Sequence, residues 1–233
     1  NARLYEEAMR AARDRDEMLA IVTHDLRTPL SAIMTAAALQ LASSGEQDDS
    51  RVLARAETIQ RSAQHMKRLI RDLTDLGQID ASRFAIEPTP QDLTLLIRHV
   101  VDTLQPVGAR QGSDIGMNVV GAVPRVVCDG DRVIQVLSNL ASNAIKVGAP
   151  SVTIHVEARG PDVLFTVWDT GPGIAPDDLP FMFDRYWRAG AAHYKGTGLG
   201  LTISKGIIDA HDGRIWVESQ LGVGTHFFFT LPC

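Results

Sequence analysis

The chain has 233 residues, of which 45% are hydrophobic and 22% are charged, and its net charge is −5. This balance is typical of a folded protein with one large or two ordinary domains, and the lack of a basic stripe argues against nucleic acid as a partner. No apolar run reaches the roughly 18 residues that span a bilayer, and the two cysteines have no metal-binding or redox spacing, so we expect a protein of the reducing cytoplasm.

The first predicted element is a long helix, in which apolar residues recur at spacings of three and four between Tyr5 and Ile33. This spacing is typical of the seam of a coiled coil or a helical bundle. Arg15 occupies one of the seam positions, which favours a looser coil over residues 1–15. We expect that segment to be a signal-transmitting helix that comes from an upstream sensor domain absent from this chain.

His24 lies within this helix, in the stretch THDLRTPL. With Leu19 and Val22 in the seam, His24 falls at heptad position f, which is the outermost point of the helix. Asp25 can hold the Nδ1–H group of the imidazole and leave Nε2 free as a nucleophile near neutral pH. Pro29 cannot donate a hydrogen bond to the carbonyl of Asp25, so the helix is expected to bend there. This bend is expected to help His24 move between an attacking and a resting geometry, and the alternative is a kink in an ordinary bundle helix without that role.

A second helical pattern runs from Val52 to Leu73, and the polar, turn-rich stretch 42–50 separates it from the first. Two long helices joined by such a loop form an antiparallel hairpin. One hairpin buries only half of a core, whereas two hairpins make a four-helix bundle. Residues 16–81 are therefore predicted to form a dimerisation hairpin, and the protein a homodimer.

Residues 82–92 contain two prolines and are predicted to be a linker. The texture then changes, because helical and strand patterns interleave over residues 93–233. Helices are predicted for 93–106 and 132–147, and strands for two segments within 151–171, for 214–220 and for 225–232. The predicted fold class is therefore a two-domain α+β protein: a helical hairpin that forms a dimeric four-helix bundle, followed by a mixed sheet with helices on one face.

Two stretches of the second domain carry polar side chains in unusual places. Asn139, Asn143 and Lys146 share one face of a predicted helix, where amide oxygens can ligate a hard divalent cation. The alternative for this stretch is a solvated face. Asp169 follows an apolar strand and precedes Gly171 and Gly173, so its carboxylate can accept a hydrogen bond from the exocyclic amine of a heterocycle. The alternative there is an ordinary β-turn.

Two further stretches lie closer to the C-terminus. GTGLGLTIS (196–204) places glycines before a predicted helix, and free N–H groups at a helix start form a cradle for an anion. The alternative is a flexible loop. FMFDRYWR (181–188) contains aromatic residues and arginines, which would otherwise be a hydrophobic anchor and solvated charges. The small residues between these two stretches are expected to form a lid over a bound ligand.

In their order, the four stretches resemble the N box, the two glycine boxes and the intervening F box of the ATP-binding domain of the GHKL superfamily, over nearly all of residues 93–233. The resemblance implies that ATP is bound by Asn139, Asn143, Lys146, Asp169, Gly171, Gly173, Ile174, Phe183, Arg185, Lys195, Gly196, Thr197, Gly198, Leu199, Gly200, Leu201 and Thr225. Two positions depart from the family pattern: Val147 stands where an aromatic residue is usual, and Asp212 stands where a glycine is common.

The same resemblance implies a role for each part of this site. Asp169 would accept the adenine amino group, and Thr225 would line the adenine end. Asn143 would ligate Mg²⁺ with Asn139 in support. The phosphates would be met by the side chains of Lys146 and Arg185 and by the backbone of Gly196, Gly198 and Gly200.

With both halves assembled, HDLRTPL is similar to the phosphoacceptor H box of two-component sensor histidine kinases, in the branch with a two-helix dimerisation hairpin before the catalytic domain. The resemblance covers about 16–233 and implies an ATP-dependent protein-histidine kinase. It would phosphorylate His24, with Asp25 as its partner, and pass the phosphoryl group to an aspartate of a response regulator. Thr28 would orient water in a phosphatase reaction on the regulator, or would have no catalytic task.

Two other functions are compatible with parts of the pattern. The chain could be a non-catalytic dimer scaffold that binds nucleotide, or a GHKL ATPase that hydrolyses ATP. The intact Asp169, Asn143, His24 and glycines argue against the scaffold. A GHKL ATPase has no reason to carry the H box, and such proteins commonly have a catalytic glutamate where Asn139 stands.

Overall fold

The computed structural model describes residues 23, 25–41, 49–185, 187 and 198–233. The chain divides into two compact units, Asn1–Thr74 and Asp75–Cys233. None of the helices described is long and apolar enough to cross a membrane.

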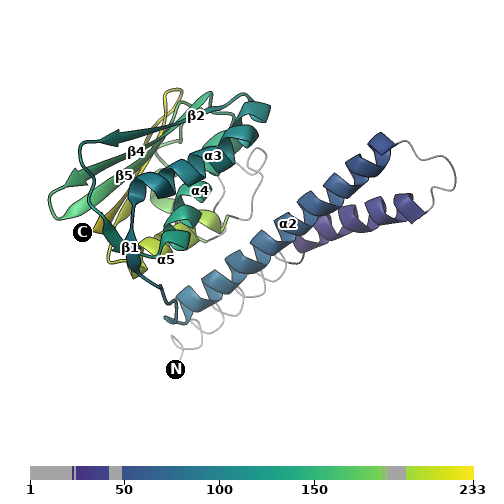
Figure 1. Cartoon of the computed structure of the whole chain (residues 1–233), viewed down its shortest axis with the longest axis horizontal. Coiled ribbons are helices and arrows are strands. Elements are labelled where there is room, and N and C mark those ends of the chain that lie inside the picture. Colours follow the sequence, from purple (N-terminus) through teal and green to yellow (C-terminus); the bar gives the residue numbers. More distant parts are fainter. Residues whose placement is uncertain (1–22, 24, 42–48, 186, 188–197) are drawn as a thin grey trace. The chain divides into compact units, whose positions relative to one another are not determined.

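The first unit contains a helical hairpin (Figure 1). Residues 25–41 are helical, and the helix continues through Pro29, which is buried. The second helix, α2, spans Asp49–Asp80. Near the loop end of the hairpin, Arg55 Nη1 donates to Gln40 Oε1 at 3.2 Å and so joins the two helices.

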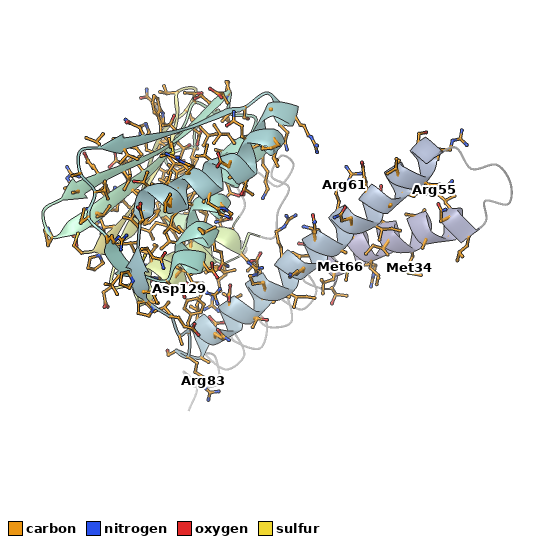
Figure 2. The ribbon with its side chains drawn as sticks, in the orientation of Figure 1. Met34, Arg55, Arg61, Met66, Arg83 and Asp129 are labelled. Atoms are coloured by element: carbon orange, nitrogen blue, oxygen red, sulfur yellow. The ribbon has the colours of Figure 1, made fainter. Side chains whose placement is uncertain are left out.

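The hairpin buries only part of the apolar surface of its two helices, and Ile70, a residue of the predicted seam, is exposed. Ala36 and Leu69 are 5% and 4% exposed, whereas Met34 is 64% and Ile70 54% exposed. Figure 2 shows Met34 on the first helix and Met66 on α2. Because apolar residues at spacings of three and four continue onto the outer side of the hairpin, this second apolar face is available to another helix pair.

The second unit contains a five-stranded mixed sheet with the strand order β2-β4-β5-β7-β6. Its strands are β2 (Asp114–Val120), β4 (Ser151–Arg159), β5 (Asp162–Asp169), β7 (Gly224–Pro232) and β6 (Ile215–Gln220). β2 runs parallel to β4, and every other neighbouring pair is antiparallel. A separate short pair joins β1 (Thr89–Gln91) to β3 (Val126–Cys128).

Three helices cover one face of this sheet: α3 (Leu93–Gln111), α4 (Gly130–Lys146) and α5 (Gly200–Ala210) (Figure 1). Alternate residues of a strand point to the same face of the sheet, and Val152, Ile154 and Val156 of β4 are all fully buried. The sheet therefore has an apolar face for the helices to cover. Across β5 and β7, the rings of Phe165 and Phe229 stack at 4.4 Å between centroids. The core therefore lies between the sheet and the three helices.

Helix α4 begins at a cap that also ties down the preceding chain. Asp129 accepts a hydrogen bond from Arg132 N at 3.2 Å through Oδ1 and one from Glu87 N at 3.1 Å through Oδ2. Figure 2 labels Asp129. On the other side of the residue, Asp129 N donates to His211 Nε2 at 3.0 Å, and His211 Nδ1 lies 2.8 Å from Ile207 O. This geometry fixes a neutral tautomer, in which Nδ1 carries the proton.

The predicted fold class of a helical hairpin followed by a mixed α/β domain is confirmed. The structure adds β2 and the β1–β3 pair, which were not predicted. Helix α3 extends past its predicted end at Pro106 to Gln111. Pro106 has no N–H group to donate to the carbonyl of Asp102, but both residues are exposed, so this carbonyl can accept a hydrogen bond from water instead.

Candidate functional site

Asp169 is the last residue of β5 and is 4% exposed. It pairs with Thr225 of β7 across the sheet, and its Oδ1 accepts a hydrogen bond from Gly171 N at 2.8 Å. Burial raises the pKa of this carboxyl above its ordinary value, while backbone hydrogen bonds from Gly171 and Thr225 and the nearby His226 act in the opposite direction. The result is a buried carboxylate that Gly171 N holds in place and that can accept a hydrogen bond from a donor such as an amino group.

The loop after Asp169 is held against the β6–β7 turn. Ile174 N donates to Ser219 Oγ at 2.8 Å, and that hydroxyl donates to Gly224 O at 2.8 Å. Since a serine hydroxyl has one proton, the Thr225 hydroxyl must donate in its 3.0 Å contact with Ser219. Gly173 has φ +71°, and a Cβ there would collide with the Gln220 carbonyl, so this close backbone approach requires glycine.

The polar face of α4 runs from the start of α5 toward the loop that follows Asp169. Asn139 Nδ2 donates to Ser204 Oγ of α5 at 3.0 Å. A Cβ on Gly200 would lie 2.9 Å from that same Nδ2, so the first turn of α5 rests directly on the Asn139 amide. At the other end, a Cβ on Gly171 would lie 3.4 Å from Val147 Cγ2, just after Lys146. Asn143 is half-buried between these ends, and Lys146 is exposed.

Phe183 joins the F-box stretch to helix α5. Its carbonyl accepts a hydrogen bond from Thr202 Oγ1 of α5 at 3.0 Å, and its ring meets Phe227 edge to face at 6.5 Å between centroids. Two residues later, Arg185 forms a bidentate ion pair with Asp80, in which Nη1 and Asp80 Oδ2 are 2.8 Å apart and Nη2 contacts Oδ1. The guanidinium predicted to meet phosphate is thus held here by a carboxylate.

The last residues of α2 belong to the second unit and contribute a network that the sequence did not indicate. Asp75 is 2% exposed and accepts hydrogen bonds from Arg132 Nη1 at 2.9 and 2.8 Å and from Gln135 Nε2 at 2.8 Å. Leu76 is 1% exposed. Ile79, three residues after Leu76, packs on Gly206 of α5, because a Cβ on Gly206 would come within 2.9 Å of Ile79 Cγ1.

The structure brings most of the predicted nucleotide residues to the ends of α4 and α5 and of β5 and β7. Ile174, Leu199 and Thr225 are buried there, while Gly198 and Leu201 flank the start of α5. The predictions for His24, Lys195, Gly196, Thr197 and the lid fall outside the described residues. Asp25 and Thr28 are described on the first hairpin helix, which belongs to the other unit.

The donor set of this site suits a hard cation held through a ligand rather than by a protein cage. Within the described part of the chain, no group of three or more His, Cys, Asp or Glu side chains could hold a metal ion. The amide oxygen of Asn143 is a hard donor, and Mg²⁺ is usually held by one or two protein oxygens, waters and substrate phosphates. Asn143 therefore fits the predicted role.

Two family models match the chain. Residues 14–82 match the "His Kinase A (phospho-acceptor) domain", and residues 128–233 match the "Histidine kinase-, DNA gyrase B-, and HSP90-like ATPase". The first match includes His24, and the second includes every residue predicted to bind ATP.

Named proteins resemble the chain over similar spans. The histidine protein kinase DivJ of Caulobacter vibrioides is 35% identical over 239 residues, which cover 99% of this chain and 39% of DivJ. The chain thus spans about two fifths of this curated relative. The structure of full-length ShkA in complex with AMPPNP is 27% identical, with a TM-score of 0.71, and the match covers 93% of this chain and 45% of ShkA.

Two structures of the histidine kinase ThkA also match. Its catalytic domain is 33% identical with a TM-score of 0.57, and the match covers 63% of this chain and 96% of that domain. ThkA in complex with the response regulator protein TrrA is 27% identical with a TM-score of 0.63, and the match covers 97% of this chain and 65% of that one.

Proposed function

The chain belongs to the sensor histidine kinases of two-component systems, and from that premise we propose that it is an ATP-dependent protein-histidine kinase core. It transfers the γ-phosphoryl group of ATP to His24 and then to an aspartate of a response regulator. One observation carries this proposal: the same chain matches both a phosphoacceptor domain and an ATPase domain. The first match includes His24, and the second includes the buried Asp169.

In the nucleotide site, each residue acts through chemistry that its surroundings favour. Asp169 accepts the adenine amino group, since its carboxylate is fixed by Gly171 N in a buried wall. Asn143 offers an amide oxygen to Mg²⁺, which supplies charge neutralisation at the phosphates when it is bound. Asn139 holds the first turn of α5 in place, so that the N–H groups at that helix start can face phosphate.

At the phosphoacceptor, Nε2 of His24 attacks the γ-phosphorus, and the bond between that phosphorus and the bridging oxygen of the β-phosphate breaks as ADP leaves. Asp25 stabilises the positive charge that develops on the ring through Nδ1–H. In the second transfer, the N–P bond breaks and an aspartate oxygen of the regulator takes the phosphoryl group. Placement and charge neutralisation supply most of the acceleration in such reactions.

The partners follow from the same reading. We infer a homodimer, because the hairpin has a second apolar face that includes Met34 and Ile70. A response-regulator receiver domain is the phosphoryl acceptor, as supported by the complex of the relative ThkA with TrrA. The core acts in the cytoplasm, where ATP and such regulators reside, and an upstream sensor supplies its input. A phosphatase reaction on the regulator, with Thr28 orienting water, is part of the proposal.

The decisive experiment follows labelled phosphate. The full chain is incubated with Mg²⁺ and ATP labelled at the γ-phosphate, and we expect acid-labile, base-stable label on the protein. His24→Ala should abolish the label while nucleotide binding survives, and His99→Ala, which changes an exposed histidine of α3, should keep both. Asp169→Asn should lose nucleotide binding. Label that persists on His24→Ala would refute the acceptor, and nucleotide bound without label on the unaltered chain would favour the scaffold.

A further inference from the structure

Arg185 has a protein partner that resembles the ligand predicted for it. We propose that the Asp80 carboxylate and the triphosphate of the nucleotide compete for the guanidinium of Arg185, so that the end of α2 lowers the affinity of the site for ATP. This inference rests on the proposed function, because it takes Arg185 to be a phosphate ligand.

The ion pair is well formed but exchangeable. Arg185 meets both carboxylate oxygens of Asp80, which is the bidentate geometry that arginine also offers to phosphate. The two side chains are 52% and 35% exposed, so water can replace either partner. By contrast, the Asp75 side chain, paired with Arg132, is only 3% exposed. Of these two pairs at the end of α2, the Asp80 pair is therefore the one that a soluble anion can open.

The rest of the helix end keeps Asp80 within reach of Arg185. Asp75 is bonded to Arg132 and Gln135 of α4, and Ile79 packs on Gly206 of α5. These contacts fix the helical turn that carries Asp80 to the nucleotide-binding unit. A competitor fixed in this way has a high effective concentration, although a single exposed pair is weak.

Arg185 is tethered beside the predicted phosphate cradle. The carbonyl of Phe183, two residues earlier, accepts a hydrogen bond from Thr202 in the first turn of α5, and this helix begins at Gly200, two residues after Gly198. A helix start is also the place where a phosphate is most favourably bound. Because a triphosphate carries more negative charge than one carboxylate, it can take the guanidinium from Asp80, but the exchange reduces its net affinity.

The test compares the affinities of the full chain for AMPPNP and for adenosine, which has no phosphate. Asp80→Asn frees the guanidinium and should tighten AMPPNP binding by about two- to fivefold, the range expected from one exposed ion pair. Adenosine binding should not change. Asp209→Asn is the matched control, because it neutralises another exposed aspartate that is paired, with Lys205 of α5. That variant should bind AMPPNP as the unaltered chain does.

A second arm separates competition from a general effect of charge. Arg185→Gln should weaken AMPPNP binding, and in that background Asp80→Asn should have no further effect. The proposal is overturned if Asp80→Asn leaves AMPPNP affinity unchanged or lowers it, if adenosine affinity moves equally, or if tightening persists without Arg185. Failure of the kinase function is recognised separately, by the lack of label on His24, which these binding measurements do not involve.

Discussion

Asp169 combines a functional chemistry with a cost in folding stability. Its pKa is raised chiefly by burial, which means that the folded protein holds the proton at pH values where the unfolded chain has lost it. Stability contributed by this group is therefore highest below the unfolded pKa, falls as pH rises from about 3.8 toward the folded pKa, and stays low above it.

Asp169→Asn should remove this dependence. The amide oxygen can still accept the hydrogen bond from Gly171 N, but it has no charge to bury. We expect the free energy of unfolding of the variant minus that of the unaltered chain to be more positive, and the variant therefore relatively more stable, at pH 7 than at pH 4. Urea unfolding followed by tryptophan fluorescence at both pH values measures the difference. An unchanged difference between the two pH values would mean that burial of Asp169 does not carry this cost.

At the residue scale, sequence reasoning finds side chains that stand in short motifs and misses those defined by distant partners. Asp169, Gly171 and Gly173 could be singled out because a strand end and its glycines are adjacent in the chain. Ser219 could not, since its bond to Ile174 spans 45 residues, and nothing local marks it. Asp75 was missed for the same reason, because Arg132 is 57 residues away.

The elements show the same division between local and distant information. β4 to β7 were predicted from alternation and from their turns, and their pairing is confirmed. β2 was missed because DIGMNVV is short and has a glycine and an asparagine in it, and its pairing partner β4 follows a whole helix later. β1 contains Pro90, which argues against a strand except at an edge or in a short pair such as this one.

Asp212 adopts φ 56°, which explains why glycine is common at that position in the family.

The contact between the end of α2 and α5 can be tested through Gly206. In Gly206→Ala the new methyl group would lie 2.9 Å from Ile79 Cγ1 and 3.2 Å from Cγ2. Since a β-branched side chain cannot rotate both atoms away, the variant should lose about 1–2 kcal/mol of stability. In an Ile79→Ala background the clash is absent, and the same change should gain about 0.5–1 kcal/mol from helix propensity.

Urea unfolding of the four proteins in this cycle, followed by tryptophan fluorescence, gives both numbers. All three tryptophans, Trp168, Trp187 and Trp216, lie in the second unit and report on it. If Gly206→Ala has the same sign in both backgrounds, Ile79 does not pack on α5 in solution.

At the scale of the whole molecule, the proposed homodimer depends on apolar residues that lie outside the two cores. On the hairpin, Met34, Leu53 and Ile70 are each more than half exposed in the single chain. A hairpin has one side facing its own partner helix, so apolar residues on the other side need a second hairpin to be covered. The helical period of the first unit is therefore the basis of the proposed homodimer.

Ile70→Glu should convert the dimer into a monomer, because two glutamates would be buried without partners in the proposed interface. Sedimentation equilibrium should give twice the chain mass of 25.3 kDa for the unaltered protein and close to the single mass for the variant. Leu95→Glu is the matched control, since Leu95 is 61% exposed on α3 of the other unit, and it should remain dimeric. Met34→Glu repeats the test from the first hairpin helix, and far-UV circular dichroism establishes that the helices persist. If both hairpin variants keep the dimer mass, the copies meet through another surface, and the exposed hairpin residues are not the dimer interface.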